Sequence, residues 1–224
     1  DLMFPIIPAN SATVSGNKEG IFGFGGGPTA VTNLVSNAGV VGTDVTGVGT
    51  ARQGPAACEY GSDKGIFGYG DTGSKVSMTN LVSNAGVVAT DVTGVGTARS
   101  NLAACGYGDD KGIFAYGWTG SRVSLSNLVT NAGVVGTDVA GVGTARLGLA
   151  ACEYGDDKGI FGFGENDSPA YTAATNLVTN AGVVGTDVTG VGTARGERLG
   201  ACGYGDDKGI FAYGHTGSDV SMSN

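Results

Sequence analysis

The chain has 224 residues, of which 44 are glycine, 41% are hydrophobic and 14% are charged, and its formal net charge is -8 at pH 7. This apolar content suits a folded core, and five prolines without a Gly-X-Y period exclude collagen and proline-rich disorder. An acidic chain repels a phosphate backbone, and no apolar run approaches the roughly 18 residues of a membrane helix, so we expect neither nucleic acid nor a bilayer as a partner.

The first ten residues, "DLMFPIIPAN", differ from everything that follows them. They hold no initiator methionine and no signal segment, which leaves a processed protein and a piece of a longer one as alternatives. Pro5 and Pro8 suit an outermost strand, because one edge of such a strand faces solvent and needs no amide donor.

One long string is then written four times. "TNLVSNAGVVGTDVTGVGTAR" begins at Thr32, and nearly the same residues return at Thr79, Ser126 and Thr175. Corresponding phenylalanines are 45, 47, 47 and 50 residues apart, at Phe22, Phe67, Phe114, Phe161 and Phe211. A period of about 47 residues is typical of propeller blades.

Each unit contains four predicted strands, which in the third unit cover residues 99–108, 112–117, 123–131 and 134–143. β-Branched and aromatic residues are bounded by Gly, Asn and Asp, and a helical period is missing. Small residues crowd the first two strands, which predicts an inner position for them. The fourth alternates Val135, Thr137 and Val139 with small or polar residues, which predicts an outer strand.

These patterns predict an all-β fold, a five-bladed β-propeller of four-stranded blades that forms a single domain. Four units are complete, at residues 11–50, 51–97, 98–144 and 145–193, and the fifth, 194–224, stops after its third strand. Residues 1–10 would supply the missing strand and close the ring by pairing with the last blade. The alternative is an open solenoid in which residues 1–10 form a cap.

The order "R-x-x-L-A-A-C-x-Y-G-D-D-K-G-I-F-x-Y-G" resembles the blades of kelch and RCC1-like propellers. The string "TNLVSN-GVV-TD-TGVGTAR" is similar to repeats of virion structural proteins of tailed bacteriophages, which often lie at tail or fibre tips. This resemblance covers almost the whole chain beyond Asn10. It implies a virion location and a structural or host-attachment role.

Catalytic, metal and cofactor sites are not expected. The chain has a single histidine, His215, and neither a nucleophile elbow nor a phosphate-binding loop. One cysteine per unit, at Cys58, Cys105, Cys152 and Cys202, predicts buried free thiols, because each lacks a second ligand at metal spacing. The recurrent Asp-Asp-Lys, as at Asp109 to Lys111, predicts tight turns and not calcium loops. A hydrolase acting on glycans stays a minority alternative.

An aspartate and an arginine also recur eight residues apart, as at Asp91 and Arg99. They suit either one ion pair per blade junction or a wall of equivalent binding sites. The second possibility predicts a secreted or surface lectin with one weak sugar site per blade. Its site residues would be Asn80, Asp91, Arg99, Asn127, Asp138 and Arg146.

The copies differ most in the loop between the second and third strands, and again between the fourth strand and the next first strand. Loops on a rigid scaffold are where recognition usually resides. We therefore predict binding of a host-surface glycan or another virion protein by these loops, with further assembly of copies as an option. The predicted residues are Asp71, Trp118, Arg122, Glu165, Tyr171 and His215.

Overall fold

The structure, a computed structural model, describes residues 19–25, 27–167, 170–205 and 207–224. These residues form thirteen strands in five small antiparallel sheets and contain no helix, which confirms the all-β prediction. The strands are β1 (Gly20–Gly23) with β2 (Thr32–Val35); β3 (Ala56–Tyr60), β4 (Lys64–Asp71) and β5 (Lys75–Val82); β6 (Ala103–Tyr107), β7 (Lys111–Ala115) and β8 (Ser126–Val129); β9 (Ala150–Tyr154), β10 (Lys158–Gly162) and β11 (Thr175–Val178); and β12 (Gly196–Tyr204) with β13 (Lys208–His215).

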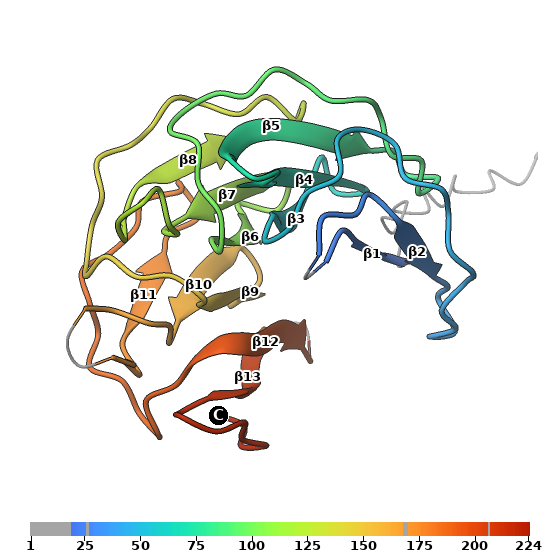
Figure 1. Ribbon diagram of the computed structural model, residues 1–224. Helices are drawn as coiled ribbons and strands as arrows, with labels where there is room; N and C mark the ends of the chain where they lie inside the picture. The colour runs from blue at the N-terminus through green and yellow to red at the C-terminus, as the bar shows by residue number, and fades with distance from the viewer. Residues whose placement is uncertain (1–18, 26, 168–169, 206) are drawn as a thin grey trace, which may run out of the picture.

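The five sheets follow one another around an arc, with β3, β6, β9 and β12 along its inner side (Figure 1). Each of these inner strands contacts the next, as the small residues of the first predicted strand led us to expect. The first and last sheets lie at the two ends of the arc, which is open between them in the described chain (Figure 1). The predicted closing strand, residues 1–10, lies outside the described residues.

The predicted fourth strand does not form a regular strand. In the third unit its backbone forms two isolated bridges with β8, Val129 with Val135 and Ser126 with Val139, and Gly136 N donates to the Leu128 carbonyl oxygen at 2.8 Å. Gly133, at φ 77°, turns the chain back from β8. The segment between the bridges holds Gly136 and Asp138, and Asp138 turns inward to bind side chains instead of extending the ladder.

Aromatic rings join successive sheets. The ring at the end of each second strand meets the phenylalanine of the following sheet at 5.1–5.5 Å between centroids, in four pairs: Phe24 with Phe67, Tyr69 with Phe114, Tyr116 with Phe161 and Phe163 with Phe211. Tyr69 and Tyr116 have positive φ, at 65° and 66°, which turns each ring out of its own sheet toward the next. The core of the molecule is therefore shared between neighbouring repeats.

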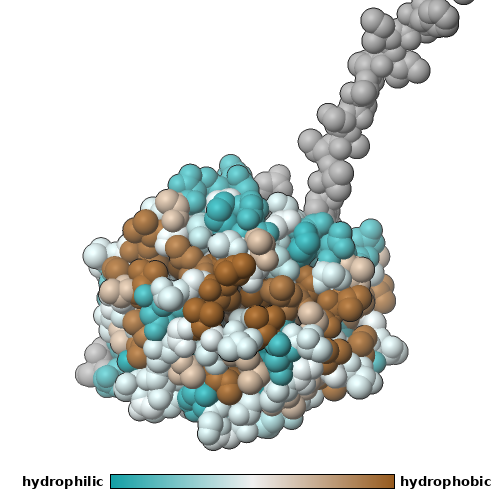
Figure 2. All heavy atoms as spheres, turned by 90° about the horizontal axis from the view of Figure 1, so that it is seen from above, coloured by the Kyte–Doolittle hydropathy of each residue, from teal (hydrophilic) through white to brown (hydrophobic). Residues whose placement is uncertain are grey.

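The outer surface carries exposed valines at the same place in each repeat. Val40, Val87, Val134 and Val183 are 61–64% exposed. Figure 2 shows apolar residues gathered in a band across the side that is seen from above. No helix among the described residues has the length and apolar character that crossing a membrane requires.

Candidate functional site

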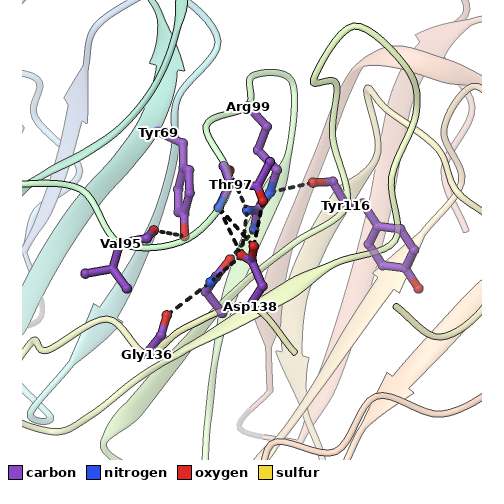
Figure 3. Close-up of polar contacts among 8 residues, drawn as sticks. Tyr69, Val95, Thr97, Arg99, Tyr116, Gly136 and Asp138 are labelled. Carbon is purple, nitrogen blue, oxygen red and sulfur yellow. Dashed lines mark hydrogen bonds and ion pairs between the residues drawn. The ribbon is translucent and has the colours of Figure 1, made fainter. Parts of the chain in front are cut away.

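The repeated arginines are fully buried: Arg52, Arg99, Arg146 and Arg195. Figure 3 shows the polar contacts of Arg99. Arg99 donates from Nε to the carbonyl oxygen of Tyr116 at 2.8 Å, and from its two terminal nitrogens to the Thr97 carbonyl at 3.1 Å and to Asn127 Oδ1 at 2.7 Å. Its guanidinium also stacks on the ring of Tyr69, 4.2 Å from the centroid, in the preceding sheet. One side chain thus connects three segments of two repeats.

Asp138 completes this cluster. Its carboxylate accepts from the Thr97 amide and hydroxyl, the latter at 2.6 Å, and from Asn127 Nδ2 at 2.9 Å, and it lies 3.9 Å from the Arg99 guanidinium. Arg99 is therefore paired with the aspartate 39 residues after it, and not with Asp91, eight residues before it as the local spacing suggested. Asp91 pairs in the same way with Arg52.

Burial changes the ionisation of these groups. It lowers the pKa of Arg52 to about 10, against the opposing effect of Asp91, so the guanidinium remains charged at neutral pH. Burial raises the pKa of Asp138, but the hydrogen bonds from Thr97 and Asn127 outweigh it and leave that pKa below its usual value. A fully buried cation is thus held beside a partly exposed carboxylate by hydrogen bonds that the chain itself supplies.

All six residues that the lectin alternative would use belong to clusters of this kind: Asn80, Asp91, Arg99, Asn127, Asp138 and Arg146. Arg99 and Arg146 are fully buried, and Asn80 and Asn127 are too. This arrangement favours a structural role, since a ligand would have to displace bonds that join the repeats.

A groove of about 660 Å³ lies where the variable loops of the first three repeats meet. Backbone pairing explains the convergence, because the residue after each repeated arginine pairs with the first residue of the variable loop. Gln53 exchanges two backbone hydrogen bonds with Asp71, both at 2.9 Å, and Ser100 does the same with Trp118. Both variable stretches found in the sequence therefore reach one groove. Its polar and aromatic lining includes Gln53, Asp71, Lys75, Ser100, Asn101 and Trp118.

Trp118 contacts an arginine that is itself anchored by ion pairs. The Arg122 guanidinium lies 5.8 Å from the centroid of its ring, and Arg122 is ion-paired with Glu165 and Asp167 of the next repeat. Of the six predicted loop residues, Asp71 and Trp118 line the groove, and Arg122 and Glu165 support it from outside. Gln53, Lys75 and Asn101 also line the groove, although they were not among the six predicted residues. Lys75 belongs to the same variable loop as Asp71, and Gln53 and Asn101 belong to the variable stretch between repeats.

The remaining two predicted residues lie at a different junction. Tyr171 meets His215 edge to face, 6.0 Å between centroids, and His215 Nδ1 is 3.1 Å from Asp219. Asp219 also pairs with Arg198. Neither Tyr171 nor His215 lines the groove at Trp118.

The repeated cysteines follow the prediction in part, and the acidic turns follow it in their backbone conformation. All four cysteines are free thiols; Cys105 and Cys152 are buried, whereas Cys58 is half-buried and Cys202 is exposed in the last sheet. The turns have the positive φ that was expected, as at Gly108 and Asp109. In the third unit Asp110 binds Lys111 and, at 3.0 Å, Asn131 Nδ2, so its carboxylate is used within the turn region.

A pair of carboxyl groups near the inner strands escaped the sequence analysis. Glu59 and Glu153 come from β3 and β9 and converge over Gly106 of β6, where any side chain would collide with Glu153. Burial, with Glu59 as a neighbour, raises the pKa of Glu153 to about 8. The alternation Glu59, Gly106, Glu153, Gly203 after the repeated cysteines was the signal available in the sequence.

Comparison with known proteins finds no matching family model and no matching curated protein.

Proposed function

We propose that the chain is a non-enzymatic recognition module of a tailed-phage virion, whose variable loops bind a host-surface glycan or another virion protein. The virion part rests on the resemblance of the repeats. The groove at Trp118 is the observation that carries the binding part, because it gathers both variable stretches around a single supported aromatic ring. Its volume lies within the range of ligand pockets, roughly 300–1,000 Å³.

We also propose that the five sheets are the blades of a β-propeller. Two exposed aromatic residues, one at each end of the arc, support this proposal. Phe22 is 65% exposed and Tyr213 is 61% exposed, whereas their counterparts in the third sheet, Phe114 and Tyr116, are fully buried. In a closed ring the last sheet would present Tyr213 to Phe22, as Tyr69 meets Phe114 within the arc.

Stability measurements test the ring. Tyr116→Ala should lower the free energy of unfolding by about 3–5 kcal/mol, as for other buried aromatic residues. Tyr213→Ala should cost a similar amount if the ring closes. A cost below about 1 kcal/mol for Tyr213→Ala would leave the arc open and contradict the propeller.

Binding measurements test the function. The purified chain should bind host cells, immobilised glycans or isolated virion proteins, and Trp118→Ala should weaken that binding without changing the unfolding curve. Tyr204→Ala is the control, because Tyr204 is also an exposed aromatic residue but lies in β12, outside the variable loops and the groove. Equal binding by the chain and by Trp118→Ala would remove the groove from the function.

A further inference from the structure

We infer that the groove at Trp118 takes an uncharged carbohydrate, with one sugar ring stacked on the indole; this rests on the proposed function and names its ligand class. Three features of the groove support this: the preorganised ring, the charge balance of the lining and the neutral hydrogen-bonding residues.

The indole is fixed before any ligand arrives. Backbone hydrogen bonds of 2.8 and 3.0 Å fix the Trp118 backbone on Ser100, and the Arg122 guanidinium lies over the indole ring, 5.8 Å from its centroid. Arg122 is only 16% exposed in its side chain and is anchored by Glu165. A rigid aromatic surface loses little conformational entropy on binding, which favours stacking of a flat apolar face such as that of a sugar ring.

The lining has no unpaired charge among its described residues. Asp71 and Lys75 are the charged groups of the groove, and they form an ion pair of 2.6 Å; Asp71 also accepts from the Gly73 amide at 2.7 Å. The hydrogen bond from Lys75 keeps the pKa of Asp71 below its usual value, which favours the carboxylate form in this ion pair. An anionic sugar would find no free cation here, and the net charge of -8 would oppose its approach.

Neutral hydrogen-bonding residues line the same groove as Trp118. Gln53 and Asn101 contribute carboxamides from two successive repeats, and each carboxamide both donates and accepts. Hydroxyl groups of a neutral sugar have the same dual character. The combination of one stacked ring with carboxamides and a closed ion pair therefore suits a neutral hexose in preference to a sialylated or uronate sugar.

The chain provides its own reporter, because Trp118 is its single tryptophan. Neutral gluco-, galacto- and manno-oligosaccharides, and sialylated and uronate oligosaccharides of matched length, are titrated against the full chain while indole emission is recorded. We expect a saturable change with at least one neutral series and none with the charged ones. Calorimetry with the same neutral oligosaccharide should show binding about tenfold weaker for Trp118→Ala, and unchanged for Tyr204→Ala, whose exposed ring lies in β12 outside the groove.

Each other outcome overturns this inference in a recognisable way. Saturable, Trp118-dependent binding of the charged sugars would keep the proposed function and refute the neutral ligand. Binding to cells or virion proteins, with no neutral oligosaccharide altering the indole emission up to millimolar concentration, would do the same. A chain that binds no sugar, cell or virion protein would defeat the proposed function itself.

Discussion

Replacing Arg99 by methionine tests whether the buried guanidinium clusters hold the repeats together. Methionine keeps much of the length and apolar stem of the side chain but removes its donors. Three acceptors then lose their partner inside the protein: the carbonyl oxygens of Tyr116 and Thr97, and Oδ1 of Asn127. Asp138 loses its cation, and Tyr69 loses a stacked group.

The expected cost follows from these losses. The Asp138 side chain is 28% exposed, so water can replace its lost cation, and the cost comes from the acceptors of the fully buried guanidinium. A buried acceptor left without a partner costs about 1–3 kcal/mol, so the free energy of unfolding should fall by about 3–5 kcal/mol in total. With a urea m-value of about 2 kcal/mol per molar, the unfolding midpoint should fall by roughly 2 M. Urea denaturation followed by circular dichroism measures this directly. Arg99→Lys should also lose stability, because an ammonium group lacks the planar fork that reaches all three acceptors.

Arg198→Met is the control. Arg198 also pairs with an aspartate, Asp219 at 2.7 Å, but its side chain is 66% exposed. An exposed pair contributes at most about 1 kcal/mol, so this variant should unfold close to the parent. If Arg99→Met and Arg198→Met unfolded within about 1 kcal/mol of each other, the buried clusters would not be what joins the repeats.

Two further predictions concern the inner strands. A Cβ on Gly112 would lie 2.9 Å from the carbonyl oxygen of Glu59 and 2.5 Å from the Cys58 thiol, so Gly112→Ala should lower the free energy of unfolding by about 1–3 kcal/mol. Gly136→Ala is the control, because its nearest neighbour is 3.5 Å away, and it should be nearly neutral in the same denaturation assay. Equal effects of the two variants would mean that β3 and β7 are not closely packed. Because the pKa of Glu153 rises from 4.5 to about 8 on folding, the folded chain binds the extra proton in that range, and stability should fall as pH rises from about 5 to 8. Glu153→Gln should flatten this dependence of the urea midpoint on pH; an identical slope in both proteins would show that Glu153 does not cause it.

Much of the fold could be predicted from the sequence because its signals are local. The 47-residue period fixes how many times a sheet is built, and β-branched and aromatic residues between turn signals place the three strands that units 51–97, 98–144 and 145–193 each form. At the Asp-Asp-Lys turns, the residues that must adopt positive φ are themselves Gly and Asp, as at Gly108 and Asp109, so the turn can be predicted from the local sequence. The fourth strand was predicted wrongly for the same reason: its alternation of Val135 and Val139 is local, but the inward turn of Asp138 depends on groups of other segments.

The candidate site depended on contacts between repeats, which the sequence alone could not supply. The sequence showed that the loops containing Asp71 and Trp118 differ between repeats. Only the packing of one sheet on the next brings these two residues to one groove and places Tyr171 and His215 at a different junction. Likewise, it showed that arginine and aspartate recur, but the choice of Asp138 over Asp91 as the partner of Arg99 is made across a whole repeat. Strand identity and turn chemistry are decided over a few residues of chain. Which side chains meet is decided by the angle and distance between sheets, and these arise only when the aromatic rings and buried guanidinium groups of successive repeats have packed together.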